Sequence, residues 1–285
     1  MRWNPAQKED IQAVITYLKE YEPLCVSLIS KLMKKGKPAF FPFSSGKLYV
    51  QHGERDDSID GVFFLTRGGV IYPMLSLKGS DPAEKEVKKL LSRWRNSVVS
   101  IIGEQRGVEI LSHCIDRNPV HILDYDLLVY EGSKINIQHL PQDFRIRKAV
   151  QGDAELIFPL QVAYEKEEVL IHPEEFNGRI SFLNLKQSLQ TEVIYLLERD
   201  GIPIAKAGTN AWGLSFAQIG GVFTIPPFRN QGYGKITVSA LINELKEMGF
   251  NACLFVKKQN ERAQGLYRSV GFTRIADFRI QYYQT

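Results

Sequence analysis

A proline- and glycine-marked stretch between Gly220 and Gly234 combines residue types that suit phosphate binding. It begins as an apolar, strand-like run, is forced out of any sheet at Pro226-Pro227, and continues as Arg229-Asn230-Gln231-Gly232-Tyr233-Gly234 into a helical pattern. The first amides of a helix have no partner within it, and they attract an anion at the positive end of the helix dipole. Arg229 adds a positive charge. The stretch therefore predicts an anion cradle; the alternative is that the glycines serve only tight packing.

The helix after this turn is predicted from its apolar spacing. Apolar residues recur at intervals of three and four, at Val238, Leu241, Ile242, Leu245 and Met248. Gly249 follows them, where a left-handed residue caps many helices. We therefore predict a helix over residues 231–248.

A second set of polar residues lies about thirty residues further along, where Asn260 precedes another helical pattern. Asn260 is a suitable N-cap, because its side-chain oxygen can accept a hydrogen bond from an amide of the following helix. Tyr267 lies on an apolar stripe with Leu266 and Val270, which is typical of a core tyrosine. Alternatively, its phenol, with a pKa of ~10, could donate a proton in a pre-set geometry.

Together, the two segments resemble the GCN5-related N-acetyltransferases (GNAT family), which bind acetyl-coenzyme A. The resemblance is strong over residues 220–272 and extends to the N-terminal half only through the order of its elements. It implies that the strand pairs its backbone with the pantetheine arm, and that the turn holds the pyrophosphate through main-chain amides. The coenzyme-binding residues that it implies are Val222, Phe223, Thr224, Arg229, Asn230, Gln231, Gly232, Tyr233, Gly234, Lys235 and Asn260.

The resemblance also suggests which residues carry out the chemistry. Tyr267 matches the tyrosine that protonates the leaving thiolate, and the asparagine that matches Asn260 also reaches the pantetheine, so Asn260 is either a cap alone or a cap and a ligand. Many relatives place a glutamate base on the fourth or fifth strand, but residues 216–219 and 253–256 contain no carboxylate, and Gln218 cannot act as a base.

The candidate bases lie elsewhere in the sequence. They are the acidic run Glu165, Glu167 and Glu168, with His172 nearby, in a region that lines the acceptor site in relatives. We take Glu168 and Tyr267 as the expected catalytic pair. A solvated charge run is the alternative for the glutamates, and a water chain could also remove the proton.

The remaining elements follow from periodicity and turn residues. In the first half we expect helices over 4–18, 23–33, 81–94 and 105–115, and strands over 47–52, 61–66, 69–77, 98–102 and 121–130. In the second half we expect helices over 153–165, 174–189, 231–248 and 261–270, strands over 144–149, 193–198, 202–207, 216–225 and 252–257, and a final strand that ends at Tyr283.

Apart from the leading strand of the second half, the two halves match element for element, which predicts a duplication. The predicted class is α/β (α+β), with tandem GNAT-like domains that each have a mixed, mostly antiparallel sheet flanked by helices. A polar connection at Leu140-Pro141-Gln142 divides a degenerate domain, residues 1–141, from a catalytic one, residues 142–285. In place of the cradle the first half has residues 77–82, with one glycine, Asp81 and Pro82, so we expect no coenzyme there. This arrangement resembles a bacterial subgroup of the family.

Composition narrows the remaining choices. The 285 residues carry 36 lysines and arginines against 32 aspartates and glutamates, and this net +4 gives no indication of nucleic-acid binding. Cys25, Cys114 and Cys253 lie too far apart for a metal or disulfide pattern, so we expect reduced thiols and no metal. No window approaches the ~18 apolar residues of a membrane span. We therefore expect a cytoplasmic protein that does not bind membranes.

The predicted function is the transfer of an acetyl group from acetyl-CoA to a primary amine, by direct attack within a ternary complex. A second hypothesis is a coenzyme-A-binding sensor without catalysis, because no strand carboxylate is evident. A third is an interaction protein in which the N-terminal copy is the working part. The acceptor, a small molecule or a protein amine, and the oligomeric state are not determined by the sequence.

Overall fold

The computed structural model describes residues 3–34, 37–38, 45–53, 58–76, 84–137 and 139–284. The N-terminal half contains, in order, β1 (Trp3–Pro5), α1 (Asp10–Glu20), α2 (Glu22–Leu32), β2 (Met33–Lys34), β3 (Lys37–Pro38), β4 (Gly46–His52), β5 (Ile59–Thr66), β6 (Val70–Leu75), α3 (Glu84–Ser92), β7 (Ser100–Glu104), α4 (Gln105–Ile115) and β8 (His121–Tyr130). The C-terminal half contains β9 (Phe144–Lys148), α5 (Ala154–Tyr164), α6 (Gly178–Thr191), β10 (Ile194–Arg199), β11 (Ile202–Trp212), β12 (Phe216–Thr224), α7 (Tyr233–Glu247), β13 (Asn251–Lys257), α8 (Glu261–Val270) and β14 (Thr273–Tyr282).

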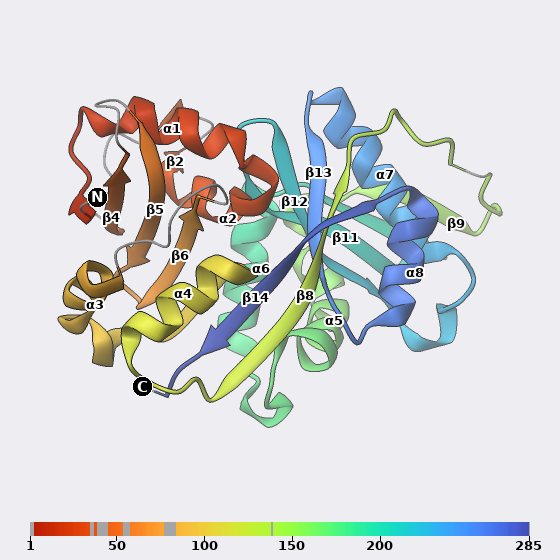
Figure 1. Ribbon diagram of the computed structural model, residues 1–285. Coiled ribbons are helices and arrows are strands. Elements are labelled where there is room, and N and C mark those ends of the chain that lie inside the picture. The colour runs from red at the N-terminus through yellow and green to blue at the C-terminus, as the bar shows by residue number, and fades with distance from the viewer. Residues whose placement is uncertain are drawn as a thin grey trace.

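One twelve-stranded sheet runs through the molecule, with helices along it (Figure 1). Its strand order is β1-β4-β5-β6-β7-β14-β8-β13-β12-β11-β10-β9. In the described part of the chain, β6 with β7 and β12 with β13 are parallel pairs, and the other neighbours in this sheet are antiparallel. The predicted mixed, mostly antiparallel α/β class is confirmed.

The N-terminus differs from the prediction. Residues 4–18 were expected to be helical, but Trp3–Pro5 forms β1 on the edge of the sheet, beside β4, and the helix begins at Asp10. Trp3 is buried, with its ring 5.1 Å from that of Phe63. Burial of this large aromatic side chain in the core explains why the segment is extended. The first half therefore also has a leading strand.

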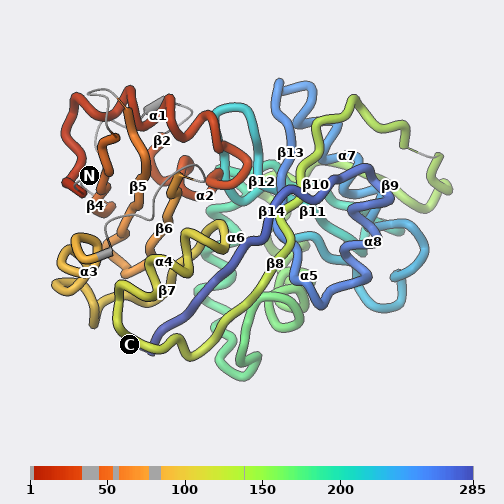
Figure 2. Tube along the Cα trace, viewed as in Figure 1, coloured from red at the N-terminus to blue at the C-terminus, as the bar shows by residue number. Residues whose placement is uncertain are grey.

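The two halves exchange their last strands. The final strand of the first half, β8, pairs with β13, and the final strand of the second half, β14, pairs with β7 as well as with β8. Figures 1 and 2 show β8 and β14 side by side across the middle of the molecule. The halves are thus joined through shared strands, while the boundary between residues 141 and 142 stays a prediction.

A buried carboxylate also joins the halves. Glu22, at the start of α2, is 2% exposed and reaches the turn between β11 and β12. Its carboxylate accepts hydrogen bonds from the backbone amides of residues 214, 215 and 216, at 2.5, 2.7 and 2.9 Å, and from the hydroxyl of Ser215 at 2.7 Å. A buried charge is tolerated when it is this fully hydrogen-bonded. The contact fixes α2 against the second half.

The segment expected to replace the cradle in the first half, residues 77–82, lies outside the described residues. All three cysteines are free and buried. In the described part of the chain, no helix is long and apolar enough to cross a membrane.

Candidate active site

A cavity opens where two parallel strands separate. β12 and β13 pair only at Phe216↔Asn251, Ala217↔Ala252 and Gln218↔Cys253. Beyond these pairs, β12 remains bonded to β11 on its other side, and a cavity of about 590 Å³ lies between β12, β13, α8 and the start of α7. The β13-facing edge of β12 from Ile219 onward therefore has no strand partner, so an extended ligand could pair with it.

The turn before α7 provides free amides at one end of this cavity. Residues 226–228 form a short 3₁₀ turn, and Asn230 and Gly232 both have positive φ angles, 61° and 83°. The chain then enters α7, and the amides of Gly232, Tyr233, Gly234 and Lys235 have no acceptor among the described residues. Asn230 and these four residues all line the cavity. Such a helix start is an anion-binding arrangement.

The two glycines of the turn have different roles. A Cβ on Gly232 would meet nothing within 4 Å, so glycine is needed there for its left-handed backbone. A Cβ on Gly234 would lie 2.8 Å from Leu266 and 3.3 Å from the hydroxyl of Thr224. Gly234 therefore permits close packing of α7 against α8 and β12.

Arg229 forms an ion pair with one glutamate of the acidic run. Its Nε donates to the carbonyl of Thr224 at 2.8 Å, and its guanidinium pairs with Glu167 at 2.7 Å. Glu167 also lies 3.6 Å from Arg262, which lines the cavity too. Arg229 thus lines the cavity beside the amides, as expected, and its guanidinium is paired with Glu167.

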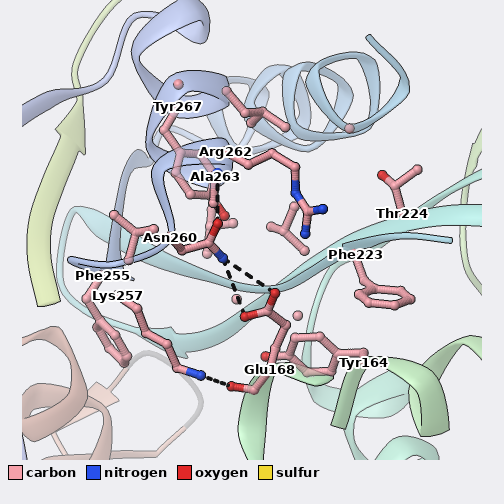
Figure 3. Close-up of a pocket in the computed structure, with 18 of the residues that line it drawn as sticks. Tyr164, Glu168, Phe223, Thr224, Phe255, Lys257, Asn260, Arg262, Ala263 and Tyr267 are labelled. Atoms are coloured by element: carbon pink, nitrogen blue, oxygen red, sulfur yellow. Dashed lines mark hydrogen bonds between the residues drawn. The ribbon is translucent and has the colours of Figure 1, made fainter. Parts of the chain in front are cut away.

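Glu168 lies inside the cavity. It belongs to a π-helical turn, Glu165–Val169, that extends α5, and its carboxylate faces Asn260 (Figure 3). The amide nitrogen of Asn260 is 3.4 and 3.5 Å from the two carboxylate oxygens, and Lys257 donates to the Glu168 carbonyl at 2.7 Å. Asn260 also caps α8, accepting from the amide of Ala263 at 3.0 Å.

Tyr267 is in the core and also lines the cavity. It is 8% exposed and packs edge-on against Phe272, at 5.7 Å between ring centroids. Its hydroxyl has no hydrogen-bond partner among the described residues. Burial, and then the nearby Tyr164 and Glu168, raise the pKa of Tyr267 above its usual value. The phenol therefore keeps its proton at neutral pH.

The other predicted residues are placed as follows. Val222, Phe223 and Thr224 line the cavity from β12. The side-chain amide of Gln231 donates to the carbonyl of Pro227 at 3.0 Å, and this exposed residue is not among those that line the cavity. Lys235 donates to the carbonyl of Ser269 at 2.8 Å. His172 is exposed beside Glu174, away from the cavity.

Three residues at or beside the site were missed by sequence reasoning. Tyr164 and Asn210 line the cavity, while Lys206 does not line it but lies behind it, with its Nζ 4.3 Å from the centroid of the Tyr164 ring and next to Gly221. Burial raises the pKa of Tyr164 to about 12, despite a hydrogen bond from the Gly221 amide that lowers it. A lysine in an otherwise apolar strand pattern, Ile202–Ala207, was the one available signal. No group of three or more metal-ligating side chains occurs in the described part of the chain.

A split pair of parallel strands followed by a helix start with free amides is an arrangement that can hold an extended ligand with an anionic group. Residues 158–272 match the acetyltransferase (GNAT) family. This part of the chain belongs to that family, as its motifs predicted.

One curated relative and several solved structures are similar to this chain. The chain is 46% identical over 59 residues to the [ribosomal protein bS18]-alanine N-acetyltransferase of Haemophilus ducreyi, which is 20% of this chain and 40% of that protein. A Drosophila protein superposes with a TM-score of 0.68 at 12% identity, covering 99% of this chain and 98% of its own.

Two further structures are similar over nearly the whole chain. A GCN5-related N-acetyltransferase from Sphaerobacter thermophilus gives a TM-score of 0.59 at 12% identity, covering 99% of this chain and 94% of its own. A tandem GNAT protein from the clavulanic acid biosynthesis pathway gives 0.56 at 10% identity, covering 100% and 99%. At these identities the likeness concerns the fold alone, and the fold is that of tandem GNAT proteins.

Proposed function

We propose that the chain transfers an acetyl group from acetyl-CoA to a primary amine, by direct attack within a ternary complex. The observation that carries this proposal is the cavity between β12 and β13, which ends at the free amides of Gly232 to Lys235. A domain of the GNAT family provides the context.

The cavity offers polar groups that suit the phosphates and the pantetheine arm of acetyl-CoA. The free amides at the start of α7 would hold the pyrophosphate, and the unpaired edge of β12 over residues 222–224 would pair with the pantetheine amides. Asn230, Lys235 and Asn260 lie along the same cavity. Bound acetyl-CoA supplies the activated thioester.

Two side chains would move the protons. Tyr267 has a protonated phenol in the cavity and would donate it to the departing thiolate. Glu168 would accept a proton from the acceptor's ammonium group, whose ordinary pKa of ~10.4 keeps it protonated at neutral pH. Both side chains line one cavity, and Figure 3 shows them on either side of Asn260.

We propose residues 142–285 as the catalytic domain and residues 1–141 as a supporting domain that binds no coenzyme. A cytoplasmic location agrees with this role. The acceptor is a small-molecule or protein amine; the Haemophilus relative is named for acetylating an alanine of a ribosomal protein.

The test is an acetyl-CoA turnover assay with a panel of amines, read as free thiol release, together with calorimetric titration of acetyl-CoA. We expect binding and turnover with at least one amine class. Binding without turnover on any amine would instead support a coenzyme sensor. A chain that does not bind acetyl-CoA at all would contradict the proposal.

A further inference from the structure

Two irregularities interrupt the pairing of β11 with β12 beside the cavity, one on each strand. Between the pairs Lys206↔Phe223 and Gly208↔Gly220, β12 has two residues opposite one on β11, which is a β-bulge at Gly221. Between the pairs Thr209↔Ile219 and Ala211↔Gln218, the extra residue is Asn210 on β11. Bulges re-aim side chains next to active sites.

Lys206 is directed at the first bulge. It is 6% exposed, and its Nζ lies 3.0 Å from the position that a Cβ on Gly221 would occupy. Its neighbour is the ring of Tyr164, 4.3 Å from Nζ to the centroid, and among the described residues it has no hydrogen bond or ion pair. The carboxylate of Glu165 is bound to Gln161 at 2.7 Å and Ser181 at 2.9 Å instead.

The side chain of Asn210 is directed at Gly220, the residue before the bulged Gly221. A Cβ on Gly220 would lie 2.4 Å from its amide nitrogen, and Asn210 lines the cavity. Its orientation is fixed from the other half of the chain: Ser27 in α2 donates to the carbonyl oxygen of Gln218 at 2.8 Å, and Gln218 donates to the carbonyl oxygen of Asn210 at 2.9 Å. The N–H groups of Asn210 are therefore left for the cavity.

Both donors lie on the same face of the sheet. Ala207 and Ile219 pack with the apolar side of α7, so their neighbours Lys206 and Gly220 face the opposite side. On that opposite side, Tyr164 packs against Lys206, and Tyr164 lines the same cavity as the carboxylate of Glu168.

We propose that Lys206 and Asn210 form a subsite for a carboxylate, so that the acceptor is an amine that also bears a carboxylate group, as an amino acid does. This inference rests on the proposed function. Glu168 would face the amine and the two nitrogens would face the carboxylate, which matches both charges of such a molecule. A carboxylate that binds a buried ammonium without a hydrogen-bond partner forms a strong charge-assisted hydrogen bond and removes the cost of leaving that ammonium unsatisfied.

The acid–base state of Lys206 agrees with this arrangement. Burial lowers its pKa to about 7, and Glu165 opposes that shift only in part. A bound carboxylate would favour the ammonium, so carboxylate binding should be accompanied by proton uptake near pH 7.5.

The experiment compares amine pairs that differ only in the carboxylate: L-lysine with 1,5-diaminopentane, L-ornithine with 1,4-diaminobutane, and L-histidine with histamine. Turnover is read as thiol release, and binding to the protein–CoA complex is read by calorimetry in two buffers of different ionisation enthalpy. We expect the carboxylate-bearing partner to be favoured by about tenfold or more in at least one pair, with proton uptake.

Variants locate the preference. Lys206→Met keeps the apolar stem and should abolish the preference and the proton uptake, while acetyl-CoA affinity stays within about twofold of the original protein. Asn210→Asp replaces donors by acceptors and should reverse the preference. Lys134→Met, which removes a surface lysine paired with Glu247, is the matched control and should change nothing.

The proposal is overturned if no pair shows a preference in turnover or in binding, or if the preference survives in Lys206→Met. Turnover of the diamines or of a peptide N-terminus without dependence on Lys206 would overturn this subsite and leave the acetyltransferase function standing. Loss of acetyl-CoA binding in the unmodified protein would instead contradict the function itself.

Discussion

Each half of the chain has one pair of parallel strands, β6 with β7 in the first half and β12 with β13 in the second. The space beyond the last paired residues is filled by side chains in the first half and is a cavity in the second. In the first half, β6 and β7 pair at Val70↔Ser100 and Ile71↔Ile101, and two residues beyond the last pair stands Pro73. In the second half, two residues beyond Gln218 stands Gly220. A Cβ on Gly103 or Gly107 would lie 3.1 or 3.4 Å from the Pro73 side chain, so β7 and α4 close directly onto its ring.

The helices that follow β7 and β13, α4 and α8, differ in the charge of the residue that caps their N-terminus. In the second half, α8 is capped by the neutral Asn260. In the first half, α4 is capped by Glu104, whose carboxylate accepts from the amides of Arg106 and Gly107, both at 3.1 Å. The first half thus supplies its own anion at that helix start, and the second half leaves its cap free of charge.

The treatment of buried charge completes the comparison. The Glu22 carboxylate of the first half accepts hydrogen bonds from four donors, whereas the Lys206 ammonium of the second half has no hydrogen-bond acceptor among the described residues. A fully satisfied charge fixes structure, and an unsatisfied one is a feature expected of binding sites. We infer that one copy retained a ligand cavity while the other became its support.

The largest effect is expected for Tyr267→Phe, which deletes a proton donor that the first half does not have. The equivalent position, seven residues after the cap Glu104, is the buried Leu111. Loss of general acid catalysis should lower kcat by ~10²–10⁴-fold with little change in acetyl-CoA affinity. Tyr130→Phe, whose hydroxyl donates to the carbonyl of Ser133, is the structural control. A kcat within about threefold, with a lowered Tm, would mean that Tyr267 only packs the core.

Lys206→Met tests how much the buried, unpaired ammonium of Lys206 destabilises the folded protein. The pKa of Lys206 is about 7 in the folded protein, against 10.5 ordinarily. Between pH 7 and pH 10.5 the unfolded chain therefore binds a proton at Lys206 that the folded protein does not bind. The destabilisation is therefore complete below pH 7 and fades as pH rises towards 10.5. The variant should raise the free energy of unfolding by roughly 3–5 kcal/mol at pH 6 and by much less at pH 10. Denaturant unfolding at both pH values measures this, and an equal effect at both would refute the buried, unpaired ammonium.

Gly232→Val tests the cradle. A β-branched residue at a φ of 83° is strained, so the free amides should be displaced and acetyl-CoA affinity should fall by about tenfold or more. Gly201→Val is the matched control, because Gly201 has a φ of 78° and equally open surroundings, and it is not among the residues that line the cavity. If calorimetry shows equal affinity in the two folded variants, the cradle assignment fails.

Ser27→Ala tests the support that the first half gives to the second. Without this hydroxyl, the amides of Gln218 and Asn210 lose their fixed orientation. We expect KM for the acceptor to rise by about three- to tenfold, from a loss of ~1 kcal/mol, with acetyl-CoA affinity unchanged. Ser30→Ala removes a hydroxyl that donates to the carbonyl of Ser27 within α2, and it should leave KM as it is. An unchanged KM in Ser27→Ala would show that the halves do not communicate through these side chains.

Local patterns predicted most elements and the glycine turn before α7, because periodicity and glycine placement act over a few residues. They missed β1, since Asn4-Pro5 looks like a helix start and only burial of Trp3 against Phe63 makes it a strand. The exchange of β8 and β14 could not be predicted, because strand partners are chosen by contacts far apart in sequence.

The candidate site shows the same limit. Apart from Gln231, the strand and turn residues of the motif and Asn260 line the cavity. The placement of Glu167 beside Arg229 depends on a π-turn that has no local sequence signature. Asn210 reaches the cavity only because a bulge re-aims it.

The central claim is that one half binds coenzyme and the other supports it, and the stoichiometry of acetyl-CoA binding tests this most directly. Calorimetric titration of the full chain should give one site per chain, and Gly232→Val should remove that site without revealing another. A stoichiometry of two, or a site that survives in the variant, would contradict the account.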